Sequence, residues 1–319
     1  MLLLRRLTAT FPLAANTRIS TRTLAMSTTA PFGRLVRFHP SSSPDQIHVG
    51  EPVDAEVDVG QAVFNSRDVL VNIFSGTSVL EPGRPTGEQS TIGQLLSPLT
   101  QKEVGTIRCI GLNYVEHAKE AGLDIPSVPT VFLKPDTALA GPWPQKTLVP
   151  KSLLQDDAAD HEAEVAVVIG RTCKDVDEQS ALSYVLGITA ANDVSSRKAQ
   201  FAQSQWCYSK GFDTSCPIGP ALVHINAVKD LSKVSIQGKV NDDIVQKSDL
   251  SDLIFSIPKI VSFLSRGTTL PAGTLILTGT PAGIGWTASP RRTLQDGDTF
   301  TVTVSNGVGS LINQVEFES

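Results

Sequence analysis

The ten residues His161-Glu-Ala-Glu-Val-Ala-Val-Val-Ile-Gly170 decide how this chain is interpreted. Their β-branched residues predict a strand, in which side chains point alternately to two faces. Glu162 and Glu164 then share one face, and the apolar side chains at alternate positions from Val165 to Ile169 share the other. Two carboxylates ~4 Å apart repel each other by roughly 4 kcal/mol at an effective dielectric of about 20. This face therefore needs a compensating positive charge.

A third carboxylate, Asp193, lies at the end of a second apolar run, residues 187–194. A divalent cation bound by Glu162, Glu164 and Asp193 would remove the repulsion. Oxygen ligands fit Mg2+, Mn2+ or Ca2+ better than Zn2+. The pattern predicts a metal site, and a solvated strand face is the alternative for a Glu-x-Glu pair taken alone.

The composition limits the class of protein. A chain of 319 residues, 40% hydrophobic and 18% charged, can form one large domain or two smaller ones. Its net charge of −5, without a basic cluster in the body of the chain, argues against nucleic acid as a partner. No apolar run approaches the roughly 20 residues of a membrane span, so no membrane partner is expected. The four cysteines lack metal-ligand spacing and are expected to be reduced thiols in an intracellular protein.

The N-terminal segment differs from the rest of the chain. It has no acidic residue before Asp45, and its arginines are interleaved with Ser, Thr, Leu and Ala. This composition predicts a mitochondrial transit peptide at residues 1–30, with a disordered basic tail as the alternative. We expect a mitochondrial matrix protein, and a start at Met26 would give a cytosolic form.

Residues 31–102 are predicted to form a small N-terminal unit. Its expected elements are strands at 34–38, 47–49 and 69–74, a Gly/Pro-rich loop at 81–87, and a short helix near 91–99.

Residues 103–319 are predicted to form the catalytic domain. Residues 299–304 alternate as a strand with its apolar side chains inward. An amphipathic helix is expected from the N-cap Ser251 to Leu264, with Pro258 bending it. The pattern indicates a β-rich α+β fold with helices packed on the outside.

His117 and Glu120 follow a predicted strand at residues 107–110. Three residues apart on a helical turn, they share a face and can form a hydrogen bond. A carboxylate beside an imidazole suits a base that activates water. The alternative is an ordinary surface pair. Asn113 is expected to cap this helix.

Three further segments carry candidate substrate-binding residues. Arg197 and Gln200, just after Asp193, could bind an anionic group, or Arg197 could form a structural ion pair. Lys210 lies among turn-forming residues and could stabilise an oxyanion, or be an exposed loop lysine. Thr280, in the Gly-rich turn at residues 278–285, could hold a carboxylate together with backbone N–H groups.

These segments, in this order, resemble the fumarylacetoacetate hydrolase superfamily from about residue 107 to the C-terminus. The resemblance implies a β-sandwich roll and a homodimer. With the peripheral helices and the small N-terminal α/β unit predicted above, this gives the expected fold. The resemblance also implies that Glu162, Glu164 and Asp193 bind Mg2+ or Mn2+ (or Ca2+ in crystals), that Arg197, Gln200 and Lys210 line the substrate site, and that His117 and Glu120 activate water. The matching motifs are Gly-x-Asn-Tyr-x-x-His at 111–117, Phe-Leu-Lys-Pro at 132–135, Glu-Ala-Glu at 162–164, Asn-Asp-Val-Ser-x-Arg-x-x-Gln at 192–200, Lys-x-Phe-Asp-Thr at 210–214, Val-Asn at 240–241 with Gln246, and Thr-Gly-Thr-Pro-Ala-Gly at 278–283.

The predicted substrate is a small anionic 2-oxo acid. The predicted reaction is metal-dependent hydrolysis of a C–C bond in an acylpyruvate, through an enolate that the metal and Lys210 stabilise. The same intermediate would serve oxaloacetate enol–keto tautomerisation or decarboxylation, which remain alternatives. Lys198, Ser209 and the Asp242-Asp243 pair depart from the family pattern. An inert, ligand-binding relative is therefore a lesser alternative.

Overall fold

Strand β10 (Ala163–Ile169), predicted from the quoted stretch, lies in the interior of the largest sheet. It pairs antiparallel with β11 (Val185–Asn192) on one side and with β16 (Leu275–Leu277) on the other. All of its residues are buried, because a hydrophobic core covers each of its faces.

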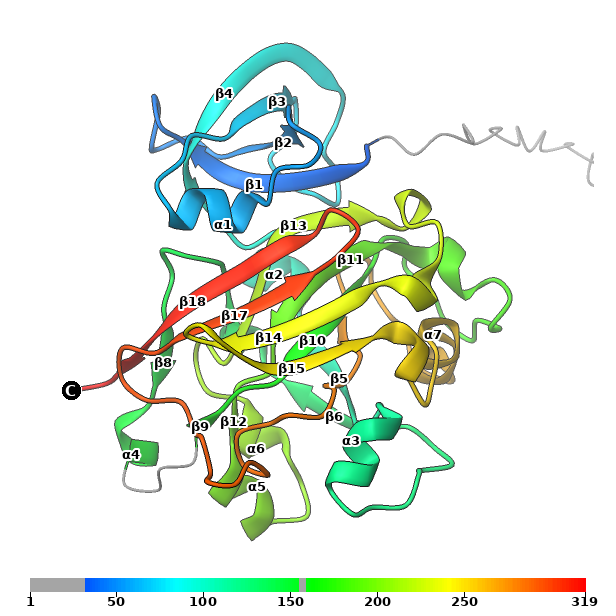
Figure 1. Ribbon diagram of the computed structural model, residues 1–319. Helices are drawn as coiled ribbons and strands as arrows, with labels where there is room; N and C mark the ends of the chain where they lie inside the picture. The colour runs from blue at the N-terminus through cyan, green and yellow to red at the C-terminus, as the bar shows by residue number, and fades with distance from the viewer. Residues whose placement is uncertain (1–31, 155–158) are drawn as a thin grey trace, which may run out of the picture.

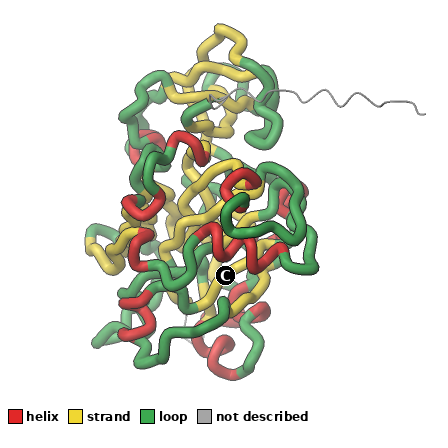
Figure 2. The backbone as a smooth tube through the Cα atoms, turned by 90° about the vertical axis from the view of Figure 1, so that its right-hand side faces the viewer, coloured by secondary structure: helices red, strands yellow, loops and turns green. Residues whose placement is uncertain are grey.

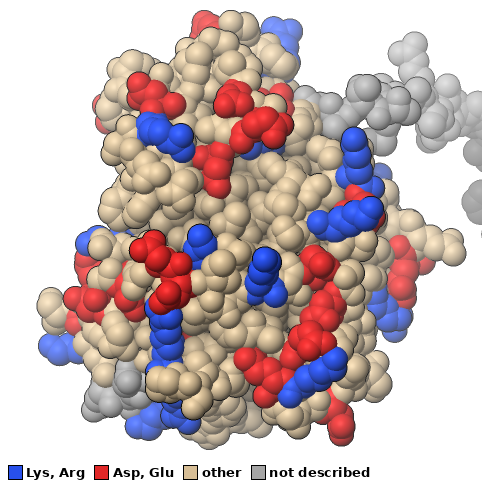
Figure 3. Space-filling model, in the orientation of Figure 1, with Lys and Arg blue, Asp and Glu red and all other residues tan. Residues whose placement is uncertain are grey.

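The structure is a computed structural model that describes residues 32–154 and 159–319. The predicted transit peptide at residues 1–30 lies outside the described residues. Among the described residues, no helix combines the length and the apolar character needed to cross a membrane. On the face drawn in Figure 3, acidic and basic side chains are interspersed.

The described residues form an eleven-stranded sheet in the order β2-β3-β4-β1-β13-β11-β10-β16-β5-β6, with β7 paired to β13 (Figure 1). Its remaining strands are β1 Arg34–Pro40, β2 His48–Pro52, β3 Leu70–Phe74, β4 Pro85–Leu95, β5 Ile107–Gly111, β6 Thr130–Lys134, β7 Leu139–Ala140 and β13 Cys216–His224. β1 joins the small N-terminal unit to the main body by pairing with β13.

A five-stranded sheet, in the order β15-β14-β17-β18-β8, packs against β10, β11 and β13. Its strands are β8 Thr147–Val149, β14 Ser235–Val240, β15 Asp243–Asp249, β17 Thr299–Val304 and β18 Gly309–Phe317. The largest core lies between the two sheets and includes Val165 and Val167 of β10 with Phe300 and Val302 of β17. This confirms the predicted inward face of residues 299–304 and the β-rich α+β fold.

Helices, loops and turns lie around the strands (Figure 2). The helices are α1 Val59–Phe64, α2 Gln101–Val104, α3 Val115–Glu120, α4 Lys151–Leu154, α5 Arg197–Ala202, α6 Cys207–Lys210 and α7 Ile257–Ser265. A two-stranded sheet pairs β9 (Ala159–Asp160) with β12 (Ser195–Ser196). This small sheet carries Asp160 next to the start of α5.

The N-terminal unit confirms the three predicted strands and corrects the predicted helix. Residues 91–95 belong to β4, where Thr91 lies opposite Leu70 and Leu95 lies opposite Phe38. Gly93 allows β4 to approach the chain closely after β1, since a Cβ atom at this position would lie 2.9 Å from the backbone of Ser41. β4 also begins at Pro85, inside the predicted loop at 81–87.

The amphipathic helix is shorter than predicted. α7 begins after the N-cap Ser256, whose side chain accepts from the amide of Lys259, and Pro258 lies in its first turn, where proline is tolerated. Ser251 instead belongs to a 3-10 turn capped by Asp249. The predicted apolar stripe is buried from Ile257 onward.

Candidate active site

The three predicted metal ligands lie together at one end of β10 and β11. Glu162 directly precedes β10, Glu164 is its second residue, and Asp193 directly follows β11. Strand pairing explains this arrangement, since the amide of Asp193 donates to the carbonyl oxygen of Glu162 at 2.9 Å. One carboxylate oxygen from each residue lies within 4.8 Å of the other two, and all three residues are buried. A solvated strand face is therefore excluded for these residues.

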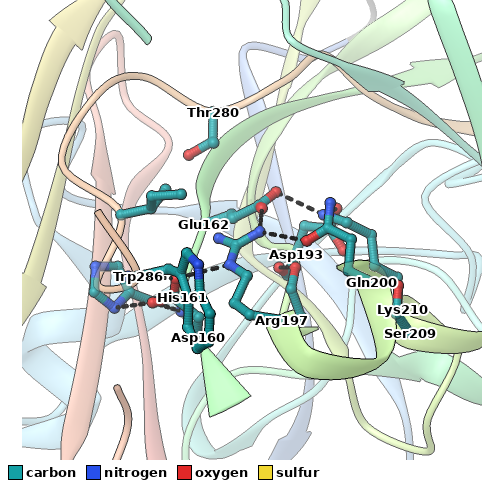
Figure 4. Close-up of polar contacts among 12 residues, drawn as sticks. Asp160, His161, Glu162, Asp193, Arg197, Gln200, Ser209, Lys210, Thr280 and Trp286 are labelled. Carbon is teal, nitrogen blue, oxygen red and sulfur yellow. Dashed lines mark hydrogen bonds and ion pairs between the residues drawn. The ribbon is translucent and has the colours of Figure 1, made fainter. Parts of the chain in front are cut away.

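Two buried lysines bind the triad. Lys210 Nζ donates to Glu162 Oε2 at 2.8 Å and to Asp193 Oδ2 at 2.7 Å (Figure 4). Lys134 Nζ donates to Asp193 Oδ1 at 2.5 Å and to the carbonyl oxygen of Ser215 at 2.6 Å. Burial alone would lower the pKa of Lys210, but the charges of Asp193 and Glu162 outweigh it and raise that pKa above its ordinary value. Lys210 is thus a charged, buried group, and the alternative of an exposed loop lysine is wrong.

Glu164 is the least compensated member of the triad. Its carboxylate accepts one hydrogen bond from the amide of Gly279 at 2.6 Å. Burial and the neighbouring charges of Asp193 and Glu162 raise the pKa of Glu164 well above its ordinary value. A divalent cation would supply the positive charge that its ionised form needs, and three carboxylates are a suitable donor set for Mg2+ or Mn2+. These residues therefore fit a hard divalent cation.

Arg197 connects the triad to neighbouring polar groups (Figure 4). Its Nε donates to Asp160 Oδ2 at 2.8 Å, and its Nη1 donates to Glu162 Oε1 at 2.5 Å and to Gln200 Oε1 at 2.9 Å. The predicted structural ion pair therefore exists. Nη2 is buried and has no hydrogen-bond partner among the described residues. The Nη2 edge of the guanidinium thus keeps hydrogen-bond donors that no described residue uses.

The His117–Glu120 pair forms as predicted on α3. His117 Nδ1 and Glu120 Oε2 are 2.9 Å apart, and the two side chains are 12% and 22% exposed. Because a carboxylate only accepts, Nδ1 carries the hydrogen and Nε2 is left as the basic atom. Burial by itself raises the pKa of Glu120, but hydrogen bonds from His117 and from the amide of Gly283 outweigh burial and lower it.

The Gly-rich turn holds carboxylates of the chain itself. The amide of Gly279 donates to Glu164 and the amide of Gly283 donates to Glu120, at 2.6 and 2.9 Å. Thr280 Oγ1 donates to the carbonyl oxygen of Ala163 at 2.9 Å, and Gln246 Nε2 donates to Thr280 Oγ1 at 2.7 Å. The turn therefore positions the triad and the His117–Glu120 pair relative to each other, and binding of a substrate by Thr280 stays a prediction.

Asn113 is not the helix cap that was predicted. The N-cap position of α3 is Tyr114, without a side-chain hydrogen bond. The buried amide of Asn113 instead donates to the carbonyl oxygens of Thr278 and Phe255, and its Oδ1 accepts from the amide of Phe255 at 2.7 Å. Asn113 thus ties the start of α3 to the end of β16.

Two site residues, Asp160 and Lys134, were not predicted from the sequence. Asp160 accepts from Arg197 and from the amides of Gly285 and Trp286, each at 2.8 or 2.9 Å. It lies two residues before Glu162, so the alternation that paired Glu162 with Glu164 could have identified it. Lys134 lies within the motif at 132–135 but had no assigned role.

Most of the predicted site residues line one cavity of about 550 Å³. Its lining includes all the predicted site residues except Glu120 and Asp193, together with Phe132, Phe201, Trp206 and Trp286. Glu162 and Glu164 of the triad, the guanidinium of Arg197 and the imidazole of His117 can therefore contact one small ligand. Positive charge and hydrogen-bond donors lie next to carboxylates that suit a cation, an arrangement that can polarise an oxygen-rich anion and activate water.

Comparison with known proteins gives a consistent result. The family described as "Fumarylacetoacetate (FAA) hydrolase C-terminal" matches residues 106–316. The caffeoylpyruvate hydrolase of Neonothopanus nambi is 40% identical over 292 residues, which cover 90% of this chain and 94% of that protein. The human mitochondrial protein named oxaloacetate tautomerase FAHD2A is 36% identical over 222 residues, which cover 69% of this chain and 68% of that protein.

Two solved structures are also similar. The 2-hydroxyhepta-2,4-diene-1,7-dioate isomerase of Mycobacterium marinum superposes with a TM-score of 0.73 at 32% identity, covering 90% of this chain and all of that one. The maleylpyruvate hydrolase of Sphingobium sp. SYK-6, solved with manganese(II) and pyruvate, has a TM-score of 0.59 at 28% identity, covering 74% of this chain and 77% of that one.

Proposed function

Because this chain belongs to the fumarylacetoacetate hydrolase family and is an enzyme acting on ketonic substrates, we propose that it is a divalent-metal-dependent hydrolase of acylpyruvates. The observation that carries the proposal is one cavity lined both by buried acids of the triad and by the His117 imidazole. At the coarser level, relatives named for each reaction support acylpyruvate hydrolase or tautomerase activity.

The proposed cofactor is Mg2+ or Mn2+, held by Glu162, Glu164 and Asp193. When bound, such a cation supplies positive charge against the developing enolate oxygen. The buried three-carboxylate donor set supports this assignment, and manganese(II) together with pyruvate is present in the maleylpyruvate hydrolase structure. A chain that lost this donor set would be expected to lose the reaction.

The cationic side chains of the cavity would bind the substrate's carboxylate. Arg197 offers Nη2, the donor that has no partner among the described residues. Gln200 accepts from Arg197 through Oε1, which orients its amide group beside the guanidinium. Lys210 adds a positive charge that Asp193 and Glu162 keep in place. These three groups would fix the 2-oxo acid end of the substrate.

His117 would act as the general base. Its Nε2 takes a proton from water, and the Nδ1–H donated to Glu120 keeps the ring in the right tautomer and stabilises its charged form. The hydroxide oxygen bonds to the distal carbonyl carbon. The C–C bond next to that carbon then breaks, and its electron pair passes to the methylene carbon as the enolate of pyruvate. Transfer of the proton held on Nε2 to that carbon gives pyruvate and a carboxylic acid, which balances the one water consumed and restores neutral His117.

Oxaloacetate tautomerisation is the second candidate. It needs the same enolate but neither water nor cleavage, because a proton is removed from oxygen and returned to carbon. The relation to FAHD2A supports this reaction. Decarboxylation through the same enolate, and an inert ligand-binding protein, are the weaker alternatives.

Location and assembly are also part of the proposal. The Arg-rich composition of residues 1–30, and the relation to a protein named as mitochondrial, support the mitochondrial matrix. A homodimer is supported by the edge strand β6, which exposes the apolar side chains of Val131 and Leu133 at 40% and 39%. Sedimentation equilibrium of the wild type and of Leu133→Glu would test the dimer.

The test of function is a product assay on purified protein with acetylpyruvate, fumarylpyruvate and enol-oxaloacetate, with and without EDTA. The hydrolase predicts release of pyruvate that EDTA abolishes and that His117→Ala lowers about 100-fold or more. Enol–keto conversion without cleavage would establish the tautomerase instead. If none of the three substrates is turned over, and no Mg2+ or Mn2+ binds at millimolar concentration, the protein is an inert, ligand-binding relative.

A further inference from the structure

The charged and the apolar side chains that line the cavity lie in different parts of it. Among the described residues that line it, the lysine and arginine side chains are Arg197 and Lys210, and both are ion-paired with Asp160, Glu162 or Asp193 at the buried triad. The outer part of the lining is apolar and aromatic. A second carboxylate on a substrate would therefore enter this part without a cationic partner from the lining, and burial of an unpaired carboxylate is costly.

Two aromatic walls define this outer part. Phe201 directly follows Gln200 on α5 and is 66% exposed, although it lines the cavity. Its ring centroid lies 5.7 Å from that of Trp286, with 34° between the ring planes. Trp206 forms the other wall, 5.7 Å from the ring of Phe132. Exposed aromatic faces at a cavity mouth gain contact area when a flat apolar group packs on them.

Trp286 and Trp206 are each positioned by neighbouring groups. The amide of Trp286 donates to Asp160 Oδ2 at 2.9 Å, and the Arg291 guanidinium lies 3.7 Å from the Trp286 ring centroid. Trp206 is pressed against the backbone of Gly111, where a Cβ atom would lie 2.4 Å from the Trp206 ring. Asp160 also accepts from Arg197 and therefore links the backbone of Trp286 to the guanidinium.

We infer that Phe201, Trp286 and Trp206 form an acyl subsite that selects acylpyruvates with a flat aromatic distal group and disfavours those with a distal carboxylate. This inference rests on the proposed function, since the 2-oxo acid end is placed at the triad. The cavity of about 550 Å³ supports it, because a four- or five-carbon 2-oxo acid would fill only the triad end. The subsite is a specificity element and takes no part in proton transfer.

The kinetic test compares kcat/KM for benzoylpyruvate, acetylpyruvate and fumarylpyruvate, measured as pyruvate release with Mg2+. Burial of a phenyl ring predicts a preference of about 10- to 100-fold for benzoylpyruvate over acetylpyruvate. Trp286→Ala and Phe201→Ala should each reduce this ratio by about fivefold or more. Tyr184→Ala is the matched control. The Arg171 guanidinium lies 4.2 Å from the Tyr184 ring centroid, as an arginine does at Trp286, but Tyr184 does not line the cavity.

A binding test separates this inference from the proposed function. The protein is titrated with phenylpyruvate or with 2-oxoglutarate in the presence of Mg2+, and tryptophan fluorescence measures the Kd of each. Tighter binding of phenylpyruvate, weakened by Phe201→Ala, supports the subsite even if no acylpyruvate is cleaved. Cleavage of all three acylpyruvates without preference for benzoylpyruvate overturns it and leaves the proposed function intact. Preference for fumarylpyruvate, lost in Arg291→Gln, also overturns it, because Arg291 would then bind the distal carboxylate.

Discussion

Arg197 Nε donates to Asp160 Oδ2 over 2.8 Å, and both side chains are buried. Asp160 also accepts from the amides of Gly285 and Trp286, so one carboxylate joins the guanidinium to the Gly-rich turn. Asp160 is thus a positioning residue for Arg197.

Asp160→Asn should weaken both connections, because an amide has one acceptor oxygen and its NH2 group would face a donor. We expect a loss of about 3 kcal/mol of unfolding free energy. KM should rise about tenfold with a smaller change in kcat, since a displaced Arg197 impairs binding more than proton transfer. Denaturant unfolding and steady-state kinetics measure the two effects. Asp68→Asn, at an exposed position of the N-terminal unit, is the control, and an unchanged KM in Asp160→Asn would contradict the positioning role.

Glu164→Gln should change stability in opposite directions with and without metal. Without metal, the substitution removes a buried carboxylate whose pKa is raised by burial, Asp193 and Glu162, so Tm should rise. With millimolar Mn2+, the wild type gains stability by binding, and Glu164→Gln should lose most of that gain. Differential scanning fluorimetry across a Mn2+ titration measures both. The exposed Glu88→Gln is the control. Equal Mn2+ stabilisation of the wild type and Glu164→Gln would exclude Glu164 as a ligand.

Glu120→Gln should lower kcat for C–C cleavage by about 10- to 100-fold, because a neutral amide does not stabilise the protonated His117 ring. Enol–keto conversion of oxaloacetate should be affected less if it does not use this base. Glu116→Gln on the same helix is the control, since Glu116 forms an exposed pair with Lys119. The prediction fails if the two variants lose the same activity.

Stability should fall between pH 7 and pH 5 partly because of His161. Burial lowers the pKa of His161, and its Nε2 lies 3.3 Å from the carbonyl oxygen of Gly283. The unfolded chain therefore binds a proton near pH 6.5 that the folded chain takes up only at lower pH. The stabilising contribution is complete above about pH 6.5 and is lost as pH falls toward the folded pKa. His161→Gln should show a smaller drop in Tm from pH 7 to pH 5, with the half-buried His39→Gln as control. An identical drop in wild type and His161→Gln would disprove this.

Local patterns predicted the parts of the site that depend on strand and helix periodicity. Alternation placed Glu162 and Glu164 on one side of β10, and the i,i+3 spacing brought His117 to Glu120 and Arg197 to Gln200. Asp193 and Lys210 were also proposed from their local sequence, but their proximity to Glu162 depends on pairing between distant segments, which no local pattern predicts.

The errors arose where tertiary contacts override local preference. The segment before α7 has a helical apolar pattern, yet the amides of Ile254 and Phe255 donate to the backbone and side chain of Asn113. These contacts hold residues 253–255 outside the helix, which begins at Ile257. Asp249, two residues before Ser251, is the cap of a 3-10 turn, and its side chain accepts from the amide of Ser251.

The central claim is that Glu162, Glu164 and Asp193 bind one divalent cation. Anomalous diffraction from crystals grown with Mn2+ tests it most directly. We predict one strong peak per chain, within bonding distance of a carboxylate oxygen of each residue, and no peak in Glu164→Gln crystals. A fully active, Mn2+-dependent enzyme whose anomalous peak lies away from these three carboxylates would contradict the claim.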